Sequence, residues 1–191
     1  MENIPSKIDE QFTFNLTKKY DVSRIAEIVS SYSDDEWNKD RSRQEAAPQV
    51  HNQTNTIVIL EISNMWQNGE SFAPELVSDN QELINLVKPI LKDHEDLYDG
   101  QAGKVVFIKL PPNGRVNDHN DNGDYLSGVR RHHLPIITND NVKFRVGNDV
   151  INMKTGECWE INNNKLHGVV NLGDSDRIHM LFDIMPKKFL V

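Results

Sequence analysis

The sequence predicts a mainly β protein with helices in its N-terminal part, because the hydrophobic pattern changes once along the chain. Before residue 100, apolar residues recur at helical spacing in two segments. From Lys104 onward they fall in short runs with a period of two, separated by turn residues, which is typical of strands. The 191 residues, 37% of them hydrophobic, fit one domain with a core of its own.

The N-terminal part is expected to contain two amphipathic helices, over 21–31 and 80–94, because each segment carries apolar residues on one helical face. We expect Pro89 to kink or split the second helix, since proline lacks the amide donor that a helix interior needs. The stretch 34–51 is polar and rich in charge, so it is predicted to be a loop. The β-rich run 56–62 is predicted to be a strand.

The second half is predicted to be a series of short strands, with Gly147 and Asn148 forming a tight hairpin turn. The predicted strands span 104–110, 131–138, 142–146, 149–153, 158–162, 168–172 and 177–184. Strands at this spacing indicate a sandwich or barrel, and their number is close to the roughly eight core strands of a jelly roll. We therefore predict a single domain over 1–191. Its double-stranded β-helix (jelly-roll, cupin-like) core would span about 56–184, with an N-terminal helical and loop elaboration over 1–103.

Composition and charge argue against several classes of function. The net charge of −8 and the pI of about 5.3 disfavour general nucleic-acid binding, which needs clustered Lys and Arg. No apolar run approaches about eighteen residues, and Met1 to Ser6 lack the pattern of a secretory signal, so we expect neither a membrane span nor secretion. Cys158 is the only cysteine, so no intrachain disulfide can form. A cytoplasmic location fits these features best.

A candidate metal site combines an H-x-D pair, His119 and Asp121, with His167 from a later predicted strand. Two histidines and one carboxylate can occupy one face of an octahedral iron(II) and leave three positions open. A chelating co-substrate fills two of these positions and oxygen fills the third. If His119 and Asp121 lie at the end of one strand, residues two apart point to the same side. Histidine and aspartate are also ordinary loop residues, so this interpretation depends on residues at other offsets.

Two arginines indicate an anion-binding site near these ligands. Arg177 opens the last predicted strand, where a buried guanidinium fork would bind the distal carboxylate of 2-oxoglutarate. The alternative is an exposed arginine on an edge strand. Arg131 and His133 alternate with Leu134 and so face away from the apolar core. A buried arginine needs an acid partner or an anion, which the metal-bound end of 2-oxoglutarate or a substrate carboxylate would supply. The alternative for this pair is a solvated sheet face.

Several segments of the second half share a pattern with a known family of enzymes. They are His119-Asn-Asp-Asn-Gly123, Arg131-His-His-Leu-Pro-Ile-Ile-Thr-Asn139, Gly156-Glu-Cys-Trp-Glu-Ile-Asn-Asn-Asn-Lys-Leu-His167, Asn171 and Asp176-Arg-Ile-His179. Together they resemble the aspartyl/asparaginyl β-hydroxylase family, and most closely its small bacterial-type members, which include cis-proline hydroxylases. The likeness covers about residues 104–184 and is much weaker before Lys104.

The resemblance implies a jelly-roll hydroxylase that uses iron(II), 2-oxoglutarate and oxygen and releases succinate and carbon dioxide. Carried over by position, the iron ligands would be His119, Asp121 and His167. Arg177 would bind the distal carboxylate of 2-oxoglutarate, and Arg131 and His133 would lie near its metal-bound end or near the substrate. The animal members that modify proteins lack the metal carboxylate, so the presence of Asp121 favours the bacterial branch with small substrates.

The predicted loop over 37–51 carries polar side chains that could cover the mouth of the barrel and recognise a substrate, namely Arg43, Gln44 and His51. The alternative is an ordinary solvated loop. The expected substrate is an amino acid, either free or as an Asp- or Asn-type residue in a protein or peptide. Two other functions stay open: a cupin-like metalloenzyme that does not use 2-oxoglutarate, and a non-catalytic β-sandwich binding module. The two arginines argue against the cupin-like enzyme, because its site needs no carboxylate clamp.

Overall fold

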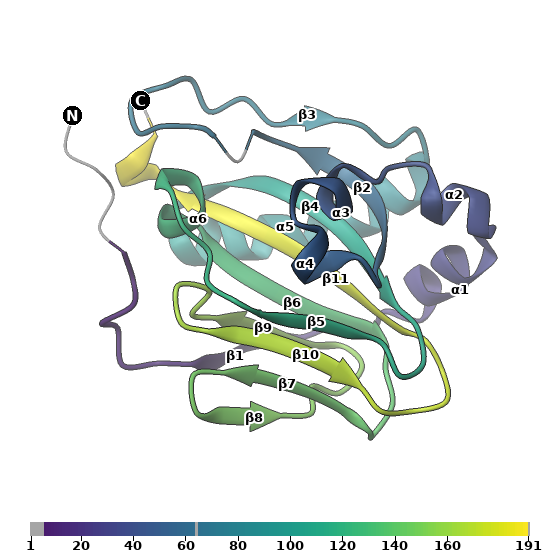
Figure 1. The fold of residues 1–191 in the computed structure, drawn as a ribbon. Coiled ribbons are helices and arrows are strands. Elements are labelled where there is room, and N and C mark those ends of the chain that lie inside the picture. The colour runs from purple at the N-terminus through teal and green to yellow at the C-terminus, as the bar shows by residue number, and fades with distance from the viewer. Residues whose placement is uncertain (1–5, 64, 191) are drawn as a thin grey trace.

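Two antiparallel β-sheets form the body of the molecule in this computed structural model, which describes residues 6–63 and 65–190 (Figure 1). The strands are β1 (Phe14–Lys19), β2 (Asn55–Glu61), β3 (Glu75–Leu76), β4 (Gly100–Leu110), β5 (Arg115–His119), β6 (Arg130–Ile137), β7 (Val142–Val146), β8 (Asp149–Ile151), β9 (Glu157–Ile161), β10 (His167–Asn171) and β11 (Arg177–Pro186). The helices are α1 (Ser23–Ser31), α2 (Asp34–Asn38), α3 (Ser42–Ala46), α4 (Pro48–His51), α5 (Gln81–Tyr98), α6 (Asp124–Gly128) and the 3₁₀ helix η1 (Lys187–Phe189). The larger sheet has strand order β1-β9-β6-β11-β4-β2-β3, and the smaller has β5-β10-β7-β8.

Helices cover one face of the larger sheet, and the smaller sheet covers the other. Val29 of α1 and Val87 of α5 share a buried core with Phe107 of β4, and α5 lies behind the larger sheet in Figure 1. On the opposite face, Leu110 of the larger sheet packs in a second core with Phe144 of the smaller sheet. Among the described residues, no helix is both long and apolar enough to cross a membrane.

β11 is the central strand of the larger sheet, with β6 on one side and β4 on the other. All ten of its residues are buried. Met180 and Phe182 belong to the core beneath the helices, whereas Arg177 and Leu181, at alternate positions, line a cavity between the two sheets. The fold therefore holds a guanidinium inside the molecule, where it needs a partner.

The mainly β architecture predicted from the sequence is confirmed, and so is the hairpin between β7 and β8. Gly147 takes a φ of 57° in that hairpin, a left-handed conformation that glycine adopts at little cost. β1, β3, β5 and α6 have no counterpart among the predicted elements. β1 is an edge strand paired with β9, and four of its six residues are exposed, so it lacks the apolar alternation that marks a half-buried strand.

In the N-terminal part, the prediction of a loop over 34–51 is wrong, and so is the prediction that Pro89 splits the second helix. The stretch 34–51 contains three short helices, α2 to α4, and is not a loop. Ser33 and Glu36 form a capping box that starts α2, and Trp37 anchors the segment with only 2% of its surface exposed. Pro89 neither ends nor divides α5, which continues through it to Tyr98. Packing of the apolar face of α5 on the sheet outweighs the missing amide donor.

Candidate metal centre and adjoining cavities

Three potential metal ligands converge at one edge of the smaller sheet. β5 ends at His119 and β10 begins at His167, and antiparallel pairing places these histidines directly opposite each other, with ring centroids 4.2 Å apart. Asp121, just beyond β5, has one carboxylate oxygen 3.8 Å from His119 Nε2 and the other 3.9 Å from His167 Nε2. The candidate ligand atoms all lie within 4.8 Å of one another. The H-x-D pair and the later histidine therefore meet in space.

Both histidines present Nε2 to this point because the backbone holds their other ring nitrogen. Nδ1 of His119 donates to the carbonyl of Asn117 at 2.8 Å, and Nδ1 of His167 donates to the carbonyl of Lys165 at 2.9 Å. A carbonyl can only accept, so the proton lies on Nδ1 and Nε2 keeps its lone pair. Burial lowers the pKa of His119, and it lowers the pKa of His167 to about 4. Both rings are therefore neutral at neutral pH, the state in which imidazole binds a metal.

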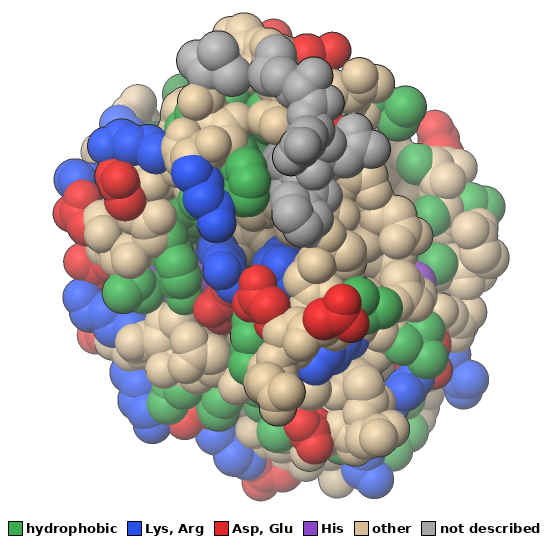
Figure 2. Space-filling model, turned by 90° about the vertical axis from the view of Figure 1, so that its left-hand side faces the viewer, with side chains coloured by type: hydrophobic (Ala, Val, Ile, Leu, Met, Phe, Trp, Pro, Cys, Tyr) green, Lys and Arg blue, Asp and Glu red, His purple; other side chains and the backbone are tan. Residues whose placement is uncertain are grey.

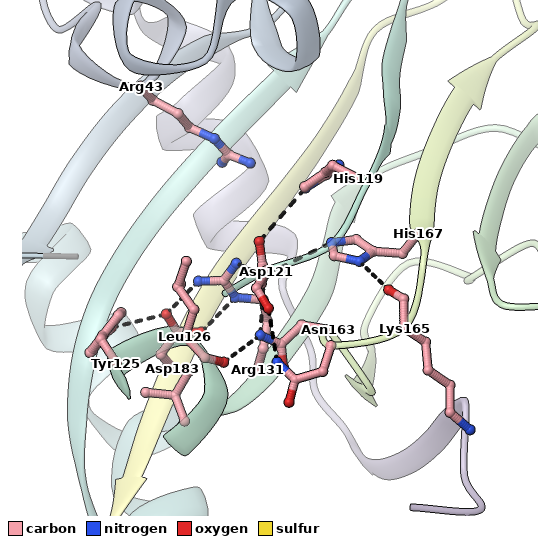
Figure 3. A network of polar contacts seen from close by, with 12 residues as sticks. Arg43, His119, Asp121, Tyr125, Leu126, Arg131, Asn163, Lys165, His167 and Asp183 are labelled. Atoms are coloured by element: carbon pink, nitrogen blue, oxygen red, sulfur yellow. Dashed lines mark hydrogen bonds and ion pairs between the residues drawn. The ribbon is translucent and has the colours of Figure 1, made fainter. Parts of the chain in front are cut away.

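The Asp121 carboxylate is oriented by donors that use one of its two oxygens. Its Oδ2 accepts from Nη1 of Arg131 at 2.5 Å and from Nδ2 of Asn163 at 3.1 Å, while Oδ1 faces His119 (Figure 3). Burial alone would raise the pKa of Asp121, but the Arg131 charge, the two histidines and the Asn163 amide lower it to about 2. The carboxylate is thus ionised and leaves Oδ1 free as a ligand atom.

Arg131 is paired with two protein carboxylates. It lies directly opposite Asp183 across β6 and β11, and its Nε and Nη2 bind the two Asp183 oxygens at 2.8 Å each, a bidentate geometry. Tyr125 donates to the same carboxylate at 3.0 Å. We expected the anion beside Arg131 to be 2-oxoglutarate or substrate. The structure gives it Asp183 and Asp121 instead, so the guanidinium already has acid partners and acts on the orientation of Asp121.

Arg177 is equally buried but has no such partner. Its Nη2 donates to Nδ1 of His179 at 2.7 Å, its Nε has no hydrogen-bond partner, and its guanidinium lies 5.8 Å from the centroid of the Phe144 ring. Within the described part of the chain, no carboxylate lies within ion-pair distance of it. Burial, and secondarily the charge of Arg43, lowers the pKa of Arg177 to about 9, so it stays charged at neutral pH. Nδ1 of buried His133 also lacks a partner.

Two adjoining cavities lie beside these residues. The smaller, of about 30 Å³, lies between the sheets and reaches Arg177 and His133. The larger, of about 620 Å³, has apolar residues such as Val58 and Leu181 and an ion pair of 2.7 Å between Glu61 and Lys104 in its walls. The walls of both cavities include Arg43, His119, Arg131 and Leu181. The hollowed face seen in Figure 2 carries Lys and Arg side chains beside acidic ones.

The three residues proposed from the 37–51 stretch have different surroundings. Arg43 points from α3 toward the candidate ligands (Figure 3), lines both cavities, and has His51 Nδ1 at 3.5 Å as its hydrogen-bond acceptor. The ring of His51 packs edge-on against His119 at 5.3 Å. Gln44 lines neither cavity, because its amide is buried and donates to the carbonyl of Thr54 at 2.8 Å. Gln44 therefore attaches α3 to the sheet, and the expectation that it contacts substrate is not supported.

Sequence reasoning missed the residues that hold the ligands in place. Asp183 lies six positions after Arg177 on the same face of β11, a spacing that the strand period would have revealed. Asn163 lies inside the motif from Gly156 to His167, whose pattern implied no role for this residue. Tyr125 lies in α6, which was not predicted. For Lys7, which contacts Asn163, no sequence signal was available.

Comparison with known proteins agrees with this architecture. The chain resembles an oxidoreductase of the 2OG-Fe(II) oxygenase family from Burkholderia pseudomallei, with a TM-score of 0.65, 12% identity, and coverage of 94% of this chain and 86% of that chain. It also resembles the viral collagen prolyl hydroxylase vCPH from Paramecium Bursaria Chlorella virus-1, solved as a 2OG complex. The TM-score is 0.59 and the identity 9%, with coverage of 94% of this chain and 99% of that chain. A third similar structure is HygX from Streptomyces hygroscopicus, solved with nickel, 2-oxoglutarate and hygromycin B. Its TM-score is 0.53 and its identity 10%, with coverage of 96% of this chain and 86% of that chain.

These likenesses concern the fold, since the identities are low. No curated protein sequence matches the chain. The family model of aspartyl/asparaginyl β-hydroxylases matches residues 24–186, which confirms the resemblance read from the motifs and, with it, the prediction of an enzyme of the 2-oxoglutarate-dependent hydroxylase class. The chain belongs to the aspartyl/asparaginyl β-hydroxylase family.

Proposed function

We propose that this protein is an iron(II)- and 2-oxoglutarate-dependent hydroxylase that acts on an amino acid or an amino-acid residue of a larger molecule. The observation that carries the proposal is the combination of two features around one cavity. His119, Asp121 and His167 present three ligand atoms at one point. Arg177, in the wall of the same cavity, is a buried cation without a carboxylate partner.

The donor set fits iron(II). Two neutral imidazole nitrogens and one carboxylate oxygen form the facial triad typical of non-haem iron(II) oxygenases. His119, Asp121 and His167 would hold the ion, and the hydrogen bonds to Asn117, Lys165 and Arg131 described above keep the ligand atoms turned toward it. Bound iron(II) and 2-oxoglutarate would activate oxygen for hydroxylation of a substrate C–H bond, with release of succinate and carbon dioxide.

The surroundings of Arg177 fit the distal carboxylate of 2-oxoglutarate. A buried guanidinium without an anion is costly, and a bidentate carboxylate would satisfy its orphaned Nε. His133 lines the same cavity and has a free Nδ1, so it would offer a further polar contact. Arg131 would act chiefly by orienting Asp121, because Nε, Nη1 and Nη2 each donate to a protein carboxylate.

The larger cavity supports a substrate with an anionic group. Burial, together with the charge of Arg131, lowers the pKa of Arg43 to about 10, which leaves it charged, and it faces the candidate ligands without an ion-pair partner among the described residues. Val58 and Leu181 offer an apolar surface for a carbon skeleton. The volume of about 620 Å³ lies within the range of about 300–1,000 Å³ typical for drug-sized ligands. This favours an amino acid carried in a peptide or other larger molecule over a single free one.

The first test is the melting temperature of the metal-free protein with manganese(II), a redox-silent substitute for iron(II), with and without 2-oxoglutarate. A ligand that binds the native state raises the melting temperature. We expect a rise with manganese and a further rise with 2-oxoglutarate that is lost in Arg177→Met and kept in the control Arg24→Met, which removes exposed ion pairs of α1 with Glu27 and with Glu82 of α5. A rise with manganese alone would favour a metalloenzyme that does not use 2-oxoglutarate. No rise with either would favour a non-catalytic binding module.

The substrate is tested by succinate release in the presence of free amino acids and of peptides that contain the same residues. We expect peptides to stimulate release more strongly, and Arg43→Met to raise the KM for the best substrate. Stronger stimulation by free amino acids would overturn the size argument and leave the co-substrate assignment intact.

A further inference from the structure

The side chain of Lys7, ahead of the first strand, enters the protein interior. Only 6% of its surface is exposed. Its ammonium donates to Oδ1 of Asn163 at 2.9 Å and to the carbonyl of Val129. Within residues 6–63 and 65–190, no carboxylate lies within ion-pair distance of it. The two acceptors are neutral, so the charge is hydrogen-bonded but not neutralised.

A buried ammonium of this kind is a poor stabiliser of a fold. Removing it from water is costly, and replacing such a group with an apolar residue of similar shape is often neutral or stabilising. Burial lowers the pKa of Lys7 to about 8, a direct sign of this cost. The position of Lys7 therefore has to be explained by what its contacts arrange.

Lys7 fixes the orientation of the Asn163 amide. Because the ammonium donates to Oδ1, the Nδ2 side of that amide must face the other way, where it donates to Oδ2 of Asp121 at 3.1 Å and to the carbonyl of Leu126 at 2.7 Å. A flipped amide would turn its NH₂ group toward an ammonium and an oxygen toward a carboxylate, and both contacts would be repulsive. The charge of Lys7 thus keeps a donor directed at the metal carboxylate.

Asn164 also links Lys7 to Asp121, but it contacts the backbone of both residues. Its Oδ1 accepts from the amide of Lys7 at 2.6 Å, and its Nδ2 donates to the carbonyl of Asp121 at 3.0 Å. Asn162 holds the carbonyl of Lys7 at 2.7 Å. Two neighbouring asparagines, 0% and 3% exposed, therefore each accept from Lys7 and donate to Asp121.

We propose that Lys7 is a positioning residue of the metal site: acting through Asn163 and Asn164, it orients Asp121 so that Oδ1 is left for the metal. The inference rests on the proposed function, because it assumes that Asp121 is a metal ligand. It assigns a role in metal binding to the N-terminal segment, which lies more than a hundred residues from His119 and His167 in the sequence.

The test is manganese(II) affinity, measured by calorimetric titration of metal-free protein, together with the melting temperature of the same samples. We expect Lys7→Met to weaken manganese binding about 10- to 100-fold, the usual effect of losing a group that orients a metal ligand, while the melting temperature stays the same or rises. Lys18→Met is the matched control, because Lys18 forms an exposed ion pair with Asp93. Its manganese affinity should equal that of the wild type.

A double-mutant cycle tests whether Lys7 acts through Asn163. Lys7→Met combined with Asn163→Leu removes both the charge and its acceptor. If Lys7 acts through Asn163, the loss of affinity in the double variant will be close to that of the larger single loss and not the product of the two. Unchanged affinity in Lys7→Met, or multiplicative losses in the cycle, would overturn the inference. Absence of manganese binding by the wild type would instead overturn the proposed function.

Discussion

Two arginines of the larger sheet, Arg131 and Arg177, are both buried and line the same cavity, but they differ in their hydrogen-bond partners. Arg131 donates from Nε, Nη1 and Nη2 to two protein carboxylates, whereas Arg177 has one histidine as acceptor and an orphaned Nε. Burial lowers the pKa of both, but the Asp183 and Asp121 charges raise the pKa of Arg131 above its ordinary value, while Arg177 falls to about 9. The paired arginine belongs to the scaffold of the site, and the unpaired one is the arginine that we propose binds 2-oxoglutarate.

The largest effect on activity should come from removing the Asp121 carboxylate, which contacts both Arg131 and the two candidate histidine ligands. We expect Asp121→Ala to abolish 2-oxoglutarate consumption, because it removes one of the three proposed metal ligands and an acceptor of Arg131. Asp118→Ala is the control, since Asp118 is half exposed and pairs with Arg145 on the surface. Consumption at the wild-type rate in Asp121→Ala would refute the iron assignment.

The two arginines should differ most in their effect on the free energy of unfolding of the ligand-free protein. Arg131→Met leaves the Asp183 carboxylate, 0% exposed, without its cation. We expect this to lower the free energy of unfolding by about 3–5 kcal/mol, the usual result of breaking a buried ion pair on one side. Urea denaturation of the metal-free protein measures it. A loss below about 1 kcal/mol would mean that water reaches Asp183.

Arg177→Met should behave in the opposite way. It removes a buried charge and strands no carboxylate, so we expect the unfolding free energy of the ligand-free protein to stay the same or increase. The affinity for 2-oxoglutarate should fall by about 1.5–3 kcal/mol, on the order of 10- to 100-fold, as charge-assisted hydrogen bonds are lost. Equal destabilisation by Arg131→Met and Arg177→Met would show that the two arginines contribute equally to the stability of the fold.

The effect expected from pH is smaller for each titrating group, and it involves histidines at the candidate metal site and elsewhere in the core. Burial lowers the pKa of all seven histidines. Below about pH 6.5 the unfolded chain binds protons that the folded chain excludes, so stability falls as pH falls, by up to about 1.4 kcal/mol per pH unit for each such histidine. For His167 this window runs down to about pH 4. Urea midpoints at pH 7.5, 6.5 and 5.5 should decrease in that order, and a flat profile would show that these rings take up protons as readily in the folded chain as in the unfolded chain.

Much of the fold followed from local pattern, and the failures have a common cause. Strands β6, β9 and β11 carry runs of apolar or alternating residues that indicate a strand without knowledge of their neighbours. The segment that forms α2 to α4 looks polar, and only its docking shows that Trp37 and Gln44 are buried. Pro89 disfavours a helix locally, and tertiary packing overrides it. Burial created by distant contacts is not visible in a local window.

The candidate site shows the same division. His119, Asp121, His167 and Arg177 were found because their chemistry is unusual and their order along the chain is informative. The acid partners of Arg131, Asp183 and Asp121, were not identified, because a buried arginine shows the need for an acid but not which acid supplies it. Lys7 was missed because a lysine near the start of a polar segment has no local feature that distinguishes it from a solvated one.

The central place of β11 in the larger sheet also bears on synthesis of the chain. Ribosomes produce proteins from the N-terminus, so β4 and β6 are made long before the strand that joins them. Until that last strand emerges, Arg131 lacks Asp183 and the cavity lacks Arg177. A nascent chain can therefore present all three candidate metal ligands before the larger sheet behind them is complete. We expect such chains to bind metal more weakly than the folded protein.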